Sequence, residues 1–285
     1  MRRTGLLICA CLVFSLMRLD AGGHLVMIGG GKRPDIVMDR IIALAGGKQA
    51  SIVIIPAASE DPLDSSLYAR HQFETRGAQN VKFLILEKGR VDLAENLEAV
   101  RGAAAVFFTG GDQNRLTEFL KDTALLEAVR DVHRRGGVIS GTSAGAAVMS
   151  AVMITGDENP AVPEGAESFT SIKSGRIVTA PGFGFMTQAI VDQHFIRRKR
   201  HNRLLSLVLE NPSLIGIGID EETAAVIGPD GLLEVLGDSL VVIYDARNAR
   251  HIATDEHGNL SALNISVHLL KNGMVFNLEE MRTRK

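Results

Sequence analysis

The sequence predicts an α/β fold, in which a mostly parallel sheet is flanked by helices on both faces and followed by an antiparallel extension. Three observations predict it. Short apolar runs alternate with amphipathic stretches through the first half of the chain, a pattern typical of βαβ units. Glycine-rich polar segments follow the ends of these runs, where ligands bind in parallel sheets. After residue 231, apolar and polar residues alternate between turn signals, as in an antiparallel meander.

The apolar runs of the first half are rich in β-branched residues and bounded by Gly, Pro or Asp, which suits strands buried on both faces. The predicted strands are Leu25–Ile28, Ser51–Ile55, Val81–Leu86, Ala104–Phe108 and Val138–Ser140. The amphipathic stretches between them predict helices at Pro34–Ala45, Leu63–Arg76, Asp92–Val100 and Gln113–Arg135.

The second half has a looser pattern. Residues Gly156–Ser174 contain Pro, Gly and acidic residues and predict a long surface loop or flap. A helical stretch at Asp192–Leu209 and two strands, Ile215–Asp220 and Ala224–Ile227, come next. The meander covers Leu232–Asn277, with turns at 255–258 and 271–273. Because no repeat or low-complexity linker divides the chain, we expect residues 22–285 to form a single domain.

Composition excludes several classes of protein. The 285 residues are 46% hydrophobic and 22% charged, values close to globular averages that exclude disorder and fibrous repeats. The 33 acidic residues nearly balance the 31 basic ones, and the formal net charge is -2. We therefore expect no nucleic-acid partner, since such proteins carry a basic patch or stripe.

Residues 1–21 resemble a secretory signal peptide. Arg2 and Arg3 precede an apolar run from Leu6 to Met17, which is short for a bilayer span. The sequence before Gly22 lacks a clean small-residue cleavage site, so a membrane anchor or a mis-assigned start remains the alternative. Cleavage would remove Cys9 and Cys11, the only cysteines, and exclude both a thiol nucleophile and a cysteine-based zinc site. We expect a secreted or periplasmic protein without a stable membrane span in its mature form.

The first glycine cluster does not predict a nucleotide site. Gly29-Gly30-Gly31 follows the first strand, but Pro34 stands where the dinucleotide fingerprint requires its third glycine. Proline suits the first turn of a helix. We expect a tight turn here, and neither an organic cofactor nor a metal.

A G-x-S-x-G motif predicts a nucleophilic serine. Ser143 lies within Gly141–Gly145, after an apolar strand and before a helical stretch of small residues at Ala146–Ala151. That context defines a nucleophile elbow, whose sharp turn exposes the serine hydroxyl at the sheet edge. The amide of Ala144 would donate to an oxyanion with help from the helix dipole. The alternative is a helix start rich in small residues and without chemistry.

Serine needs a base, and the base needs an acid to orient it. His194 is the favoured histidine because it lies in a polar segment just before an arginine cluster. The acid is expected among Asp220, Glu221 and Glu222, which follow an apolar strand. Periodicity alone does not distinguish which of the three points toward the histidine.

Four motifs together resemble the cyanophycinases, which are serine peptidases related to α-aspartyl dipeptidase. The motifs are Gly-Gly-Asp-Gln at 110–113, Gly-Thr-Ser-Ala-Gly-Ala at 141–146, Asp-Gln-His-Phe at 192–195 with Arg200 and Arg203 behind it, and Gly-Ile-Gly-Ile-Asp-Glu at 216–221. The resemblance implies a flavodoxin-like fold of the class I glutamine amidotransferase type and a homodimer. It also implies the site residues: a triad of Ser143, His194 and Glu221, oxyanion donors at Gly111 and Ala144, and substrate contacts from Gln113, Asp192, Gln193, Arg200 and Arg203.

The substrate implied by this resemblance is cyanophycin, a poly-aspartate chain carrying arginine on each β-carboxyl group. Cleavage of its backbone releases β-Asp-Arg dipeptides. The arginine carboxylates suit guanidinium clamps at Arg200 and Arg203, and the guanidinium of each repeat suits an acid such as Asp192. The alternatives are a secreted peptidase for other acidic or isoaspartyl peptides, an α/β-hydrolase-type esterase, and a non-catalytic binding module on the same scaffold.

Overall fold

A computed structural model describes residues 22–163 and 165–283. The predicted signal peptide, residues 1–21, lies outside the described residues. Among those that are described, no helix combines the length and apolar character needed to cross a membrane.

The chain alternates strands and helices up to residue 147 and is mainly β-structure after that. The helices are α1 (Asp35–Leu44), α2 (Pro62–Thr75), α3 (Ala94–Arg101), α4 (Gln113–Leu120), α5 (Ala124–Arg134), α6 (Ala144–Ala147) and α7 (His201–Glu210). The strands of the first half are β1 (His24–Ile28), β2 (Ser51–Ile55), β3 (Asn80–Phe83), β4 (Ala105–Phe108) and β5 (Val138–Thr142). The later strands are β6 (Val152–Glu158), β7 (Ile177–Pro181), β8 (Ala189–Gln193), β9 (Ile215–Ile219), β10 (Thr223–Ile227), β11 (Leu232–Gly237), β12 (Leu240–Asp245), β13 (Arg250–Thr254), β14 (Leu260–Leu263), β15 (Ser266–Lys271), β16 (Val275–Asn277) and β17 (Arg282–Thr283).

The main sheet has the strand order β17-β16-β11-β10-β1-β5-β4-β2-β3. From β1 to β3 all neighbours are parallel, whereas β10, β11, β16 and β17 pair antiparallel. Ile28 lies opposite Thr142, so the ends of β1 and β5 are level with each other. The segments that follow these two strands, including Ser143, therefore leave the sheet side by side.

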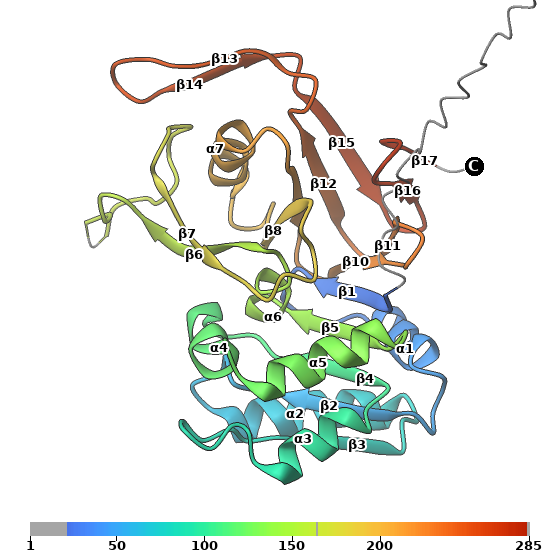
Figure 1. Cartoon of the computed structure of the whole chain (residues 1–285). Coiled ribbons are helices and arrows are strands. Elements are labelled where there is room, and N and C mark those ends of the chain that lie inside the picture. The colour runs from blue at the N-terminus through green and yellow to red at the C-terminus, as the bar shows by residue number, and fades with distance from the viewer. Residues whose placement is uncertain (1–21, 164, 284–285) are drawn as a thin grey trace, which may run out of the picture.

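A second sheet of four strands, in the order β15-β12-β9-β8, brings in the remaining polar motifs. β8 and β9 are parallel, so His194 and Glu221, which follow them, leave this sheet at the same edge. Figure 1 shows this sheet and α7 above β1 and β5, which lie in the middle of the main sheet. Two hairpins, β6–β7 and β13–β14, extend on the side of α7.

Three hydrophobic clusters hold these layers together. Helices α1 and α2 cover one face of the parallel strands, with Val37, Ile41 and Phe73 fully buried. On the other face, α3 to α6 and the inner side of the second sheet share one large cluster. The outer side of the second sheet is covered by α7. The parallel half thus has helices on both faces, as the sequence predicts.

Two predicted helices differ from the structure. The predicted helix Gln113–Arg135 is two helices, because Asp122 adopts a left-handed conformation (φ 60) and Thr123 caps α5 through its hydroxyl. The prediction for Asp192–Leu209 is wrong at its start, since Asp192 and Gln193 end the buried strand β8 and α7 begins at His201. The preceding apolar residues 189–191 belong to that strand.

The predicted loop Gly156–Ser174 begins later than expected. β6 continues to Glu158, and the connection to β7 covers residues 159–176. The predicted meander is antiparallel, but its strands divide between both sheets and the β13–β14 hairpin.

The coarse prediction is therefore confirmed: the fold is mixed α/β, with a large, mainly parallel sheet, helices and C-terminal antiparallel strands. The order β3-β2-β4-β5 corresponds to the first four positions of the flavodoxin order 2-1-3-4-5. The next position is held by β1, the first strand of the chain.

Candidate active site

Ser143 occupies a strained turn between β5 and α6. Its backbone has φ 53 and ψ -112, outside the regions that serine ordinarily adopts, as a nucleophile elbow requires. The turn is held by hydrogen bonds from the Ser143 amide to the Ile28 carbonyl (2.9 Å) and from the Ala146 amide to the Ser143 carbonyl (2.9 Å). A Cβ on Gly145 would lie 2.4 Å from the Phe108 carbonyl oxygen, so only glycine fits here.

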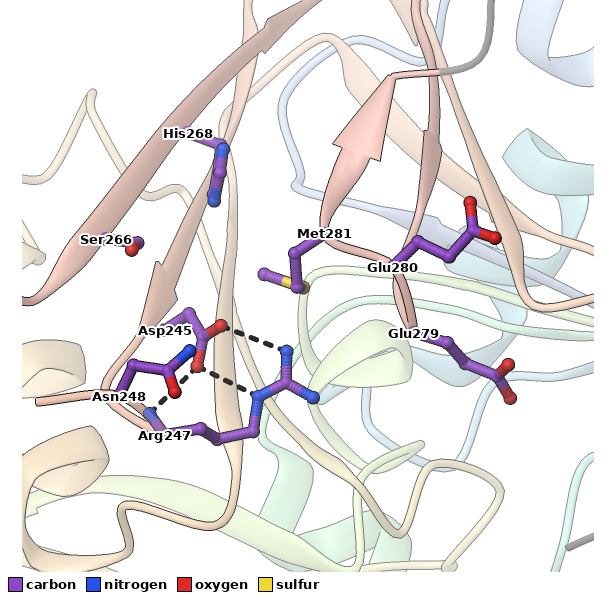
Figure 2. Close-up of a pocket in the computed structure, with 8 residues that line it drawn as sticks. All are labelled: Asp245, Arg247, Asn248, Ser266, His268, Glu279, Glu280 and Met281. Atoms are coloured by element: carbon purple, nitrogen blue, oxygen red, sulfur yellow. Dashed lines mark hydrogen bonds and ion pairs between the residues drawn. The ribbon is translucent and has the colours of Figure 1, made fainter.

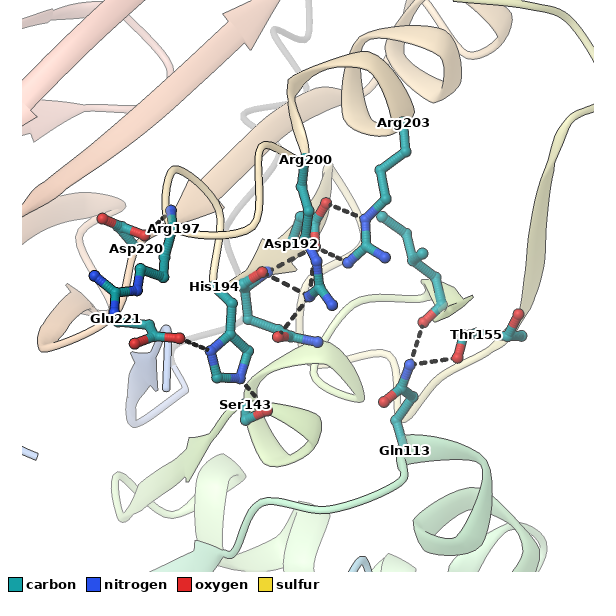
Figure 3. A network of polar contacts seen from close by, with 12 residues as sticks. Gln113, Ser143, Thr155, Asp192, His194, Arg197, Arg200, Arg203, Asp220 and Glu221 are labelled. Atoms are coloured by element: carbon teal, nitrogen blue, oxygen red, sulfur yellow. Dashed lines mark hydrogen bonds and ion pairs between the residues drawn. The ribbon is translucent and has the colours of Figure 1, made fainter. Parts of the chain in front are cut away.

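The side chains of Ser143, His194 and Glu221 form one hydrogen-bonded chain (Figure 3). Ser143 Oγ lies 2.8 Å from His194 Nε2, and His194 Nδ1 lies 2.6 Å from Glu221 Oε1. Because a carboxylate only accepts, Nδ1 carries the imidazole proton and Nε2 is left to accept from the serine hydroxyl. The geometry therefore selects Glu221 from the three acids that the sequence left open.

The two neighbouring acids have other positions. Asp220 Oδ1 accepts hydrogen bonds from the amides of Ile196 (3.0 Å) and Arg197 (2.9 Å), just after His194, and its Oδ2 accepts from the Ser239 hydroxyl (2.7 Å). Glu222 has a left-handed backbone (φ 57) and turns the chain into β10. Sequence reasoning missed the role of Asp220 in holding the histidine turn.

The environment keeps His194 neutral. Burial lowers the pKa of its imidazole below 6.5, and the positive charges of Arg198 and Arg200 lower it further. The hydrogen bond and charge of Glu221 act in the opposite direction and raise the pKa. Since a general base must be unprotonated, this balance suits proton transfer at neutral pH.

The two predicted oxyanion donors flank the serine. Ala144 directly follows it at the start of α6, and Gly111 follows Gly110, where an added Cβ would lie 3.4 Å from Ser143 Cβ. Helix α6 has only 4 residues, Ala144–Ala147, whereas the sequence predicts a helical stretch at Ala146–Ala151. The individual amides, rather than a helix dipole, are therefore the available donors.

Asp192 and Arg203 form a buried ion pair. Each is 1% exposed, Arg203 Nε donates to Asp192 Oδ2 (2.7 Å), and a second bond joins Arg203 Nη2 to Asp192 Oδ1. Asp192 was predicted to contact a substrate guanidinium, but here its charge is compensated by Arg203. Arg203 Nη1 is enclosed without a partner in the described part of the chain.

Arg200 and Gln193 are hydrogen-bonded to each other, and Figure 3 shows Arg200 above Ser143. Arg200 Nη1 donates to both the side-chain and the main-chain oxygen of Gln193, at 2.8 Å each. Burial, followed by the neighbouring charge of Arg203, lowers the pKa of Arg200 to about 10, so it stays a cation at neutral pH. Its Nη2 and Nε have no hydrogen-bond partner among the described residues and are available to a ligand.

Gln113 lies to one side of the serine and is tied to β6. Its Nε2 donates to the carbonyls of Ile154 (2.9 Å) and Thr155 (2.5 Å). Within residues 22–163 and 165–283, its Oε1 has no hydrogen-bond partner. In Figure 3, Gln113 lies below Arg203, and both lie to the right of Ser143.

The 159–176 connection is attached to β6 and α7 through Phe169, a residue that sequence reasoning also missed. The Phe169 amide donates to Glu158, its carbonyl accepts from Asn202 Nδ2 (2.9 Å), and its ring lies 4.8 Å from the Arg203 guanidinium. Glu158 is in turn paired with Arg176 (2.8 Å). This segment therefore supports Arg203.

A separate cavity of about 400 Å³ lies away from these residues (Figure 2). Its lining comes from the ends of β12, β15 and the segment before β17, and includes Asp245, Arg247 and His268. Asp245 and Arg247 neutralise each other through a bond of 2.9 Å. None of the predicted site residues lines this cavity. The described residues contain no group of three or more His, Cys, Asp or Glu side chains placed to hold a metal ion.

Comparison with known proteins defines the class. Residues 25–235 match peptidase family S51, so the chain belongs to this family. It is a cyanophycinase-like serine-type peptidase, as the four linked motifs predict.

The most similar curated relatives that we compared are cyanophycinases. The cyanophycinase of Trichormus variabilis is 36% identical over 265 residues, covering 89% of this chain and 85% of its own. That of Geminocystis herdmanii is 35% identical over 264 residues, with 88% and 93% covered. A peptidase from an acI-B1 actinobacterium has a similar fold, with a TM-score of 0.66, 24% identity, and 90% and 97% of the two chains covered.

Proposed function

We propose that this protein is an exported serine hydrolase that cleaves the poly-aspartate backbone of cyanophycin and releases β-Asp-Arg dipeptides. The observation that carries the proposal is the hydrogen-bonded chain from Ser143 Oγ through His194 to Glu221. The kinship with cyanophycinases supports the substrate.

In the first step, His194 Nε2 takes the proton of the Ser143 hydroxyl as Oγ attacks a backbone carbonyl carbon. Glu221 stabilises the imidazolium that forms. His194 then gives this proton to the leaving amine as the C–N bond breaks, and an acyl ester remains on Ser143.

In the second step, water gives a proton to His194 and attacks the ester, which restores the serine hydroxyl and releases the carboxylic acid product. In both steps the amides of Gly111 and Ala144 would donate to the oxyanion. Their position on either side of Ser143 supports this role.

We assign recognition of the substrate to a group of polar side chains near Ser143. The free nitrogens of Arg200 would bind a carboxylate, and Gln193 and Gln113 would supply amide groups beside it. Asp192 orients Arg203 and Arg200 from behind, since Arg200 Nη1 lies 3.8 Å from Asp192 Oδ1. Arg203 is enclosed, Nη1 included, so its proposed role is to hold Asp192 and not to contact the substrate directly.

The proposal also includes export, a homodimer and a flavodoxin-like fold. Export rests on the sequence of residues 1–21, and N-terminal sequencing of the protein recovered outside the cytoplasm tests it. The homodimer rests on the family resemblance and on the edge strand β15, where Val267 and Leu269 are exposed. Light scattering of the purified protein measures its mass directly. The finer flavodoxin-like assignment rests on the order of β3, β2, β4 and β5.

The decisive experiment is mass spectrometry of the products formed from insoluble cyanophycin, with Ser143→Ala as the control. β-Asp-Arg from the wild type and none from the variant is the expected result. Free arginine would instead indicate cleavage of the isopeptide bond. Turnover of simple esters without any peptide cleavage would favour an esterase.

A further inference from the structure

Arg33 is a buried arginine that none of the steps above uses. It is 6% exposed and follows the glycine turn after β1. Its guanidinium carbon lies 4.8 Å from the centre of the Tyr68 ring and 5.4 Å from that of Phe107. A buried cation normally has a carboxylate beside it, because an isolated charge is costly to remove from water.

No carboxylate of the described residues forms an ion pair with Arg33, and the acids at the starts of α1 and α2 have other partners. Asp35 is paired with Arg76 (3.1 Å), and Asp61 caps α2 by accepting from the Asp64 amide (3.0 Å). The groups that contact the guanidinium are a phenol and two aromatic faces, none of them negatively charged at neutral pH. Arg33 is therefore a largely buried cation with aromatic neighbours and no counter-charge among the described residues.

The strand order brings this cation close to β5, the strand that leads to Ser143. Arg33 follows β1, whereas Phe107 lies near the end of β4, and β5 runs between these two strands. Two strand spacings are about 10 Å, so the segment from the end of β1 to the Arg33 guanidinium spans the width of β5, the strand that leads to Ser143. The backbone that leads to Arg33 is also next to the triad, since a Cβ on Gly31 would lie 3.1 Å from the side chain of Glu221.

Arg33 lies on the opposite face of the sheet from Gln113. Phe107 belongs to the cluster under α1 and α2, whereas Leu116 of α4, the helix that carries Gln113, belongs to the cluster on the other face. On α1 and the first two turns of α2, four large side chains are about half exposed, and Tyr68 among them contacts Arg33: Ile36, Leu63, Leu67 and Tyr68. They provide an apolar surface for the methylene arm of a bound group.

We propose that Arg33 binds a substrate carboxylate on the α1–α2 side of Ser143. This inference rests on the proposed function and extends it: the enzyme would bind an anionic group on each side of the scissile bond, through Arg200 on one and Arg33 on the other. The fitting ligand is a carboxylate on a flexible aliphatic arm, such as the arginine branch of a β-Asp-Arg repeat. A planar guanidinium held over two aromatic rings can bind such a group bidentately.

The test compares two synthetic oligomers of three β-Asp-Arg repeats, one with free arginine carboxylates and one with these groups converted to primary amides. We expect Arg33→Met to lower kcat/KM for the acid oligomer by about 10- to 100-fold, and for the amide by less than about 3-fold. Methionine keeps the apolar contact with the rings. The matched control is Arg70→Met, which removes an exposed charge of α2 that is already paired with Glu74.

If Arg33→Met fails to fold, Arg33→Lys keeps the charge but not the bidentate geometry. Inhibition by N-acetylarginine and by its amide then distinguishes the roles, since only the acid should lose affinity. An equal loss on acid and amide ligands would overturn the inference and leave Arg33 a structural residue. Failure of the wild type to cleave either oligomer would overturn the proposed function itself, and with it the assigned carboxylate.

Discussion

Asp220 and Glu221 are adjacent in the chain and act on the same histidine through different atoms. Glu221 contacts the imidazole of His194 at 2.6 Å, whereas Asp220 accepts from the amides of Ile196 and Arg197 that follow it. His194 itself has a left-handed backbone (φ 49), which is unfavourable for a residue with a Cβ. The hydrogen bonds of Asp220 therefore hold a turn that would otherwise relax.

Asp220→Ala should lower both stability and turnover. We expect a loss of about 3 kcal/mol in the free energy of unfolding, because charge-assisted hydrogen bonds to two amides and one hydroxyl disappear. The kcat should fall by about 100-fold as His194 loses its position. Urea denaturation and steady-state kinetics measure the two effects.

The control is Ser239→Ala, which removes one of these hydrogen bonds and leaves both amides bound. It should cost about 1 kcal/mol and leave kcat nearly unchanged. Equal kinetic effects of the two variants would contradict a positioning role for Asp220.

The pH dependence of kcat/KM should report His194. Because burial lowers its pKa, activity should persist below pH 6.5 and be lost only as the pH falls through the lowered value. Glu221→Gln removes a group that raises this pKa, so the acid limb should move to still lower pH while kcat falls by about 100- to 10,000-fold.

Glu222→Gln removes a charge from the next residue and is the comparison for this profile. It should leave the acid limb in place. An acid limb that moved to higher pH in Glu221→Gln would contradict the assignment of Glu221 as the partner of His194.

Much of the fold was predictable because its signals are local. β1, β2, β4 and β5 are short apolar runs with turn residues at their ends, and the elbow at Ser143 follows from its own five residues. The division of the C-terminal strands between two sheets was not predictable, since it depends on contacts between β9, β12 and β15, which lie far apart in the sequence.

The site was predictable in residue type more than in arrangement. Asp192 follows an apolar triplet that fits a helix as well as a strand, so its place at the end of β8 was missed. Whether Glu221 or Asp220 faces His194 depends on the turn after β9, where side chains do not alternate regularly as they do in a strand. Arg33 has no sequence signal beyond its place after a glycine turn.

The buried pair of Asp192 and Arg203 should act mainly on stability. Asp192→Asn leaves Arg203 buried without a counter-charge, and we expect a loss of about 3–5 kcal/mol in the free energy of unfolding. The double variant Asp192→Leu with Arg203→Met should recover most of this loss, since no charge then remains unpaired.

The exposed pair Arg70–Glu74 provides the reference for this measurement. Glu74→Gln should cost less than about 1 kcal/mol in the same urea titration. If Asp192→Asn lost as little stability as this surface variant, Asp192 would not be a structural partner of Arg203. A direct contact of Asp192 with substrate would then be favoured.

Alanine substitutions at Gly30 and Gly46 separate the effect of backbone strain from the effect of damage to the active site. It has φ 110, and a Cβ there would lie 2.2 Å from the imidazole of His194. Gly46 has nearly the same backbone, φ 105, but no atom lies within 4 Å of an added Cβ. Both alanine variants should lose about 1–2 kcal/mol of stability from the left-handed backbone. Only Gly30→Ala should also displace His194, with a fall in kcat/KM of about 100-fold or more. Thermal unfolding and kinetics of the two variants, measured side by side, check this difference, and equal activity would show that the imidazole position matters less than its hydrogen bonds indicate.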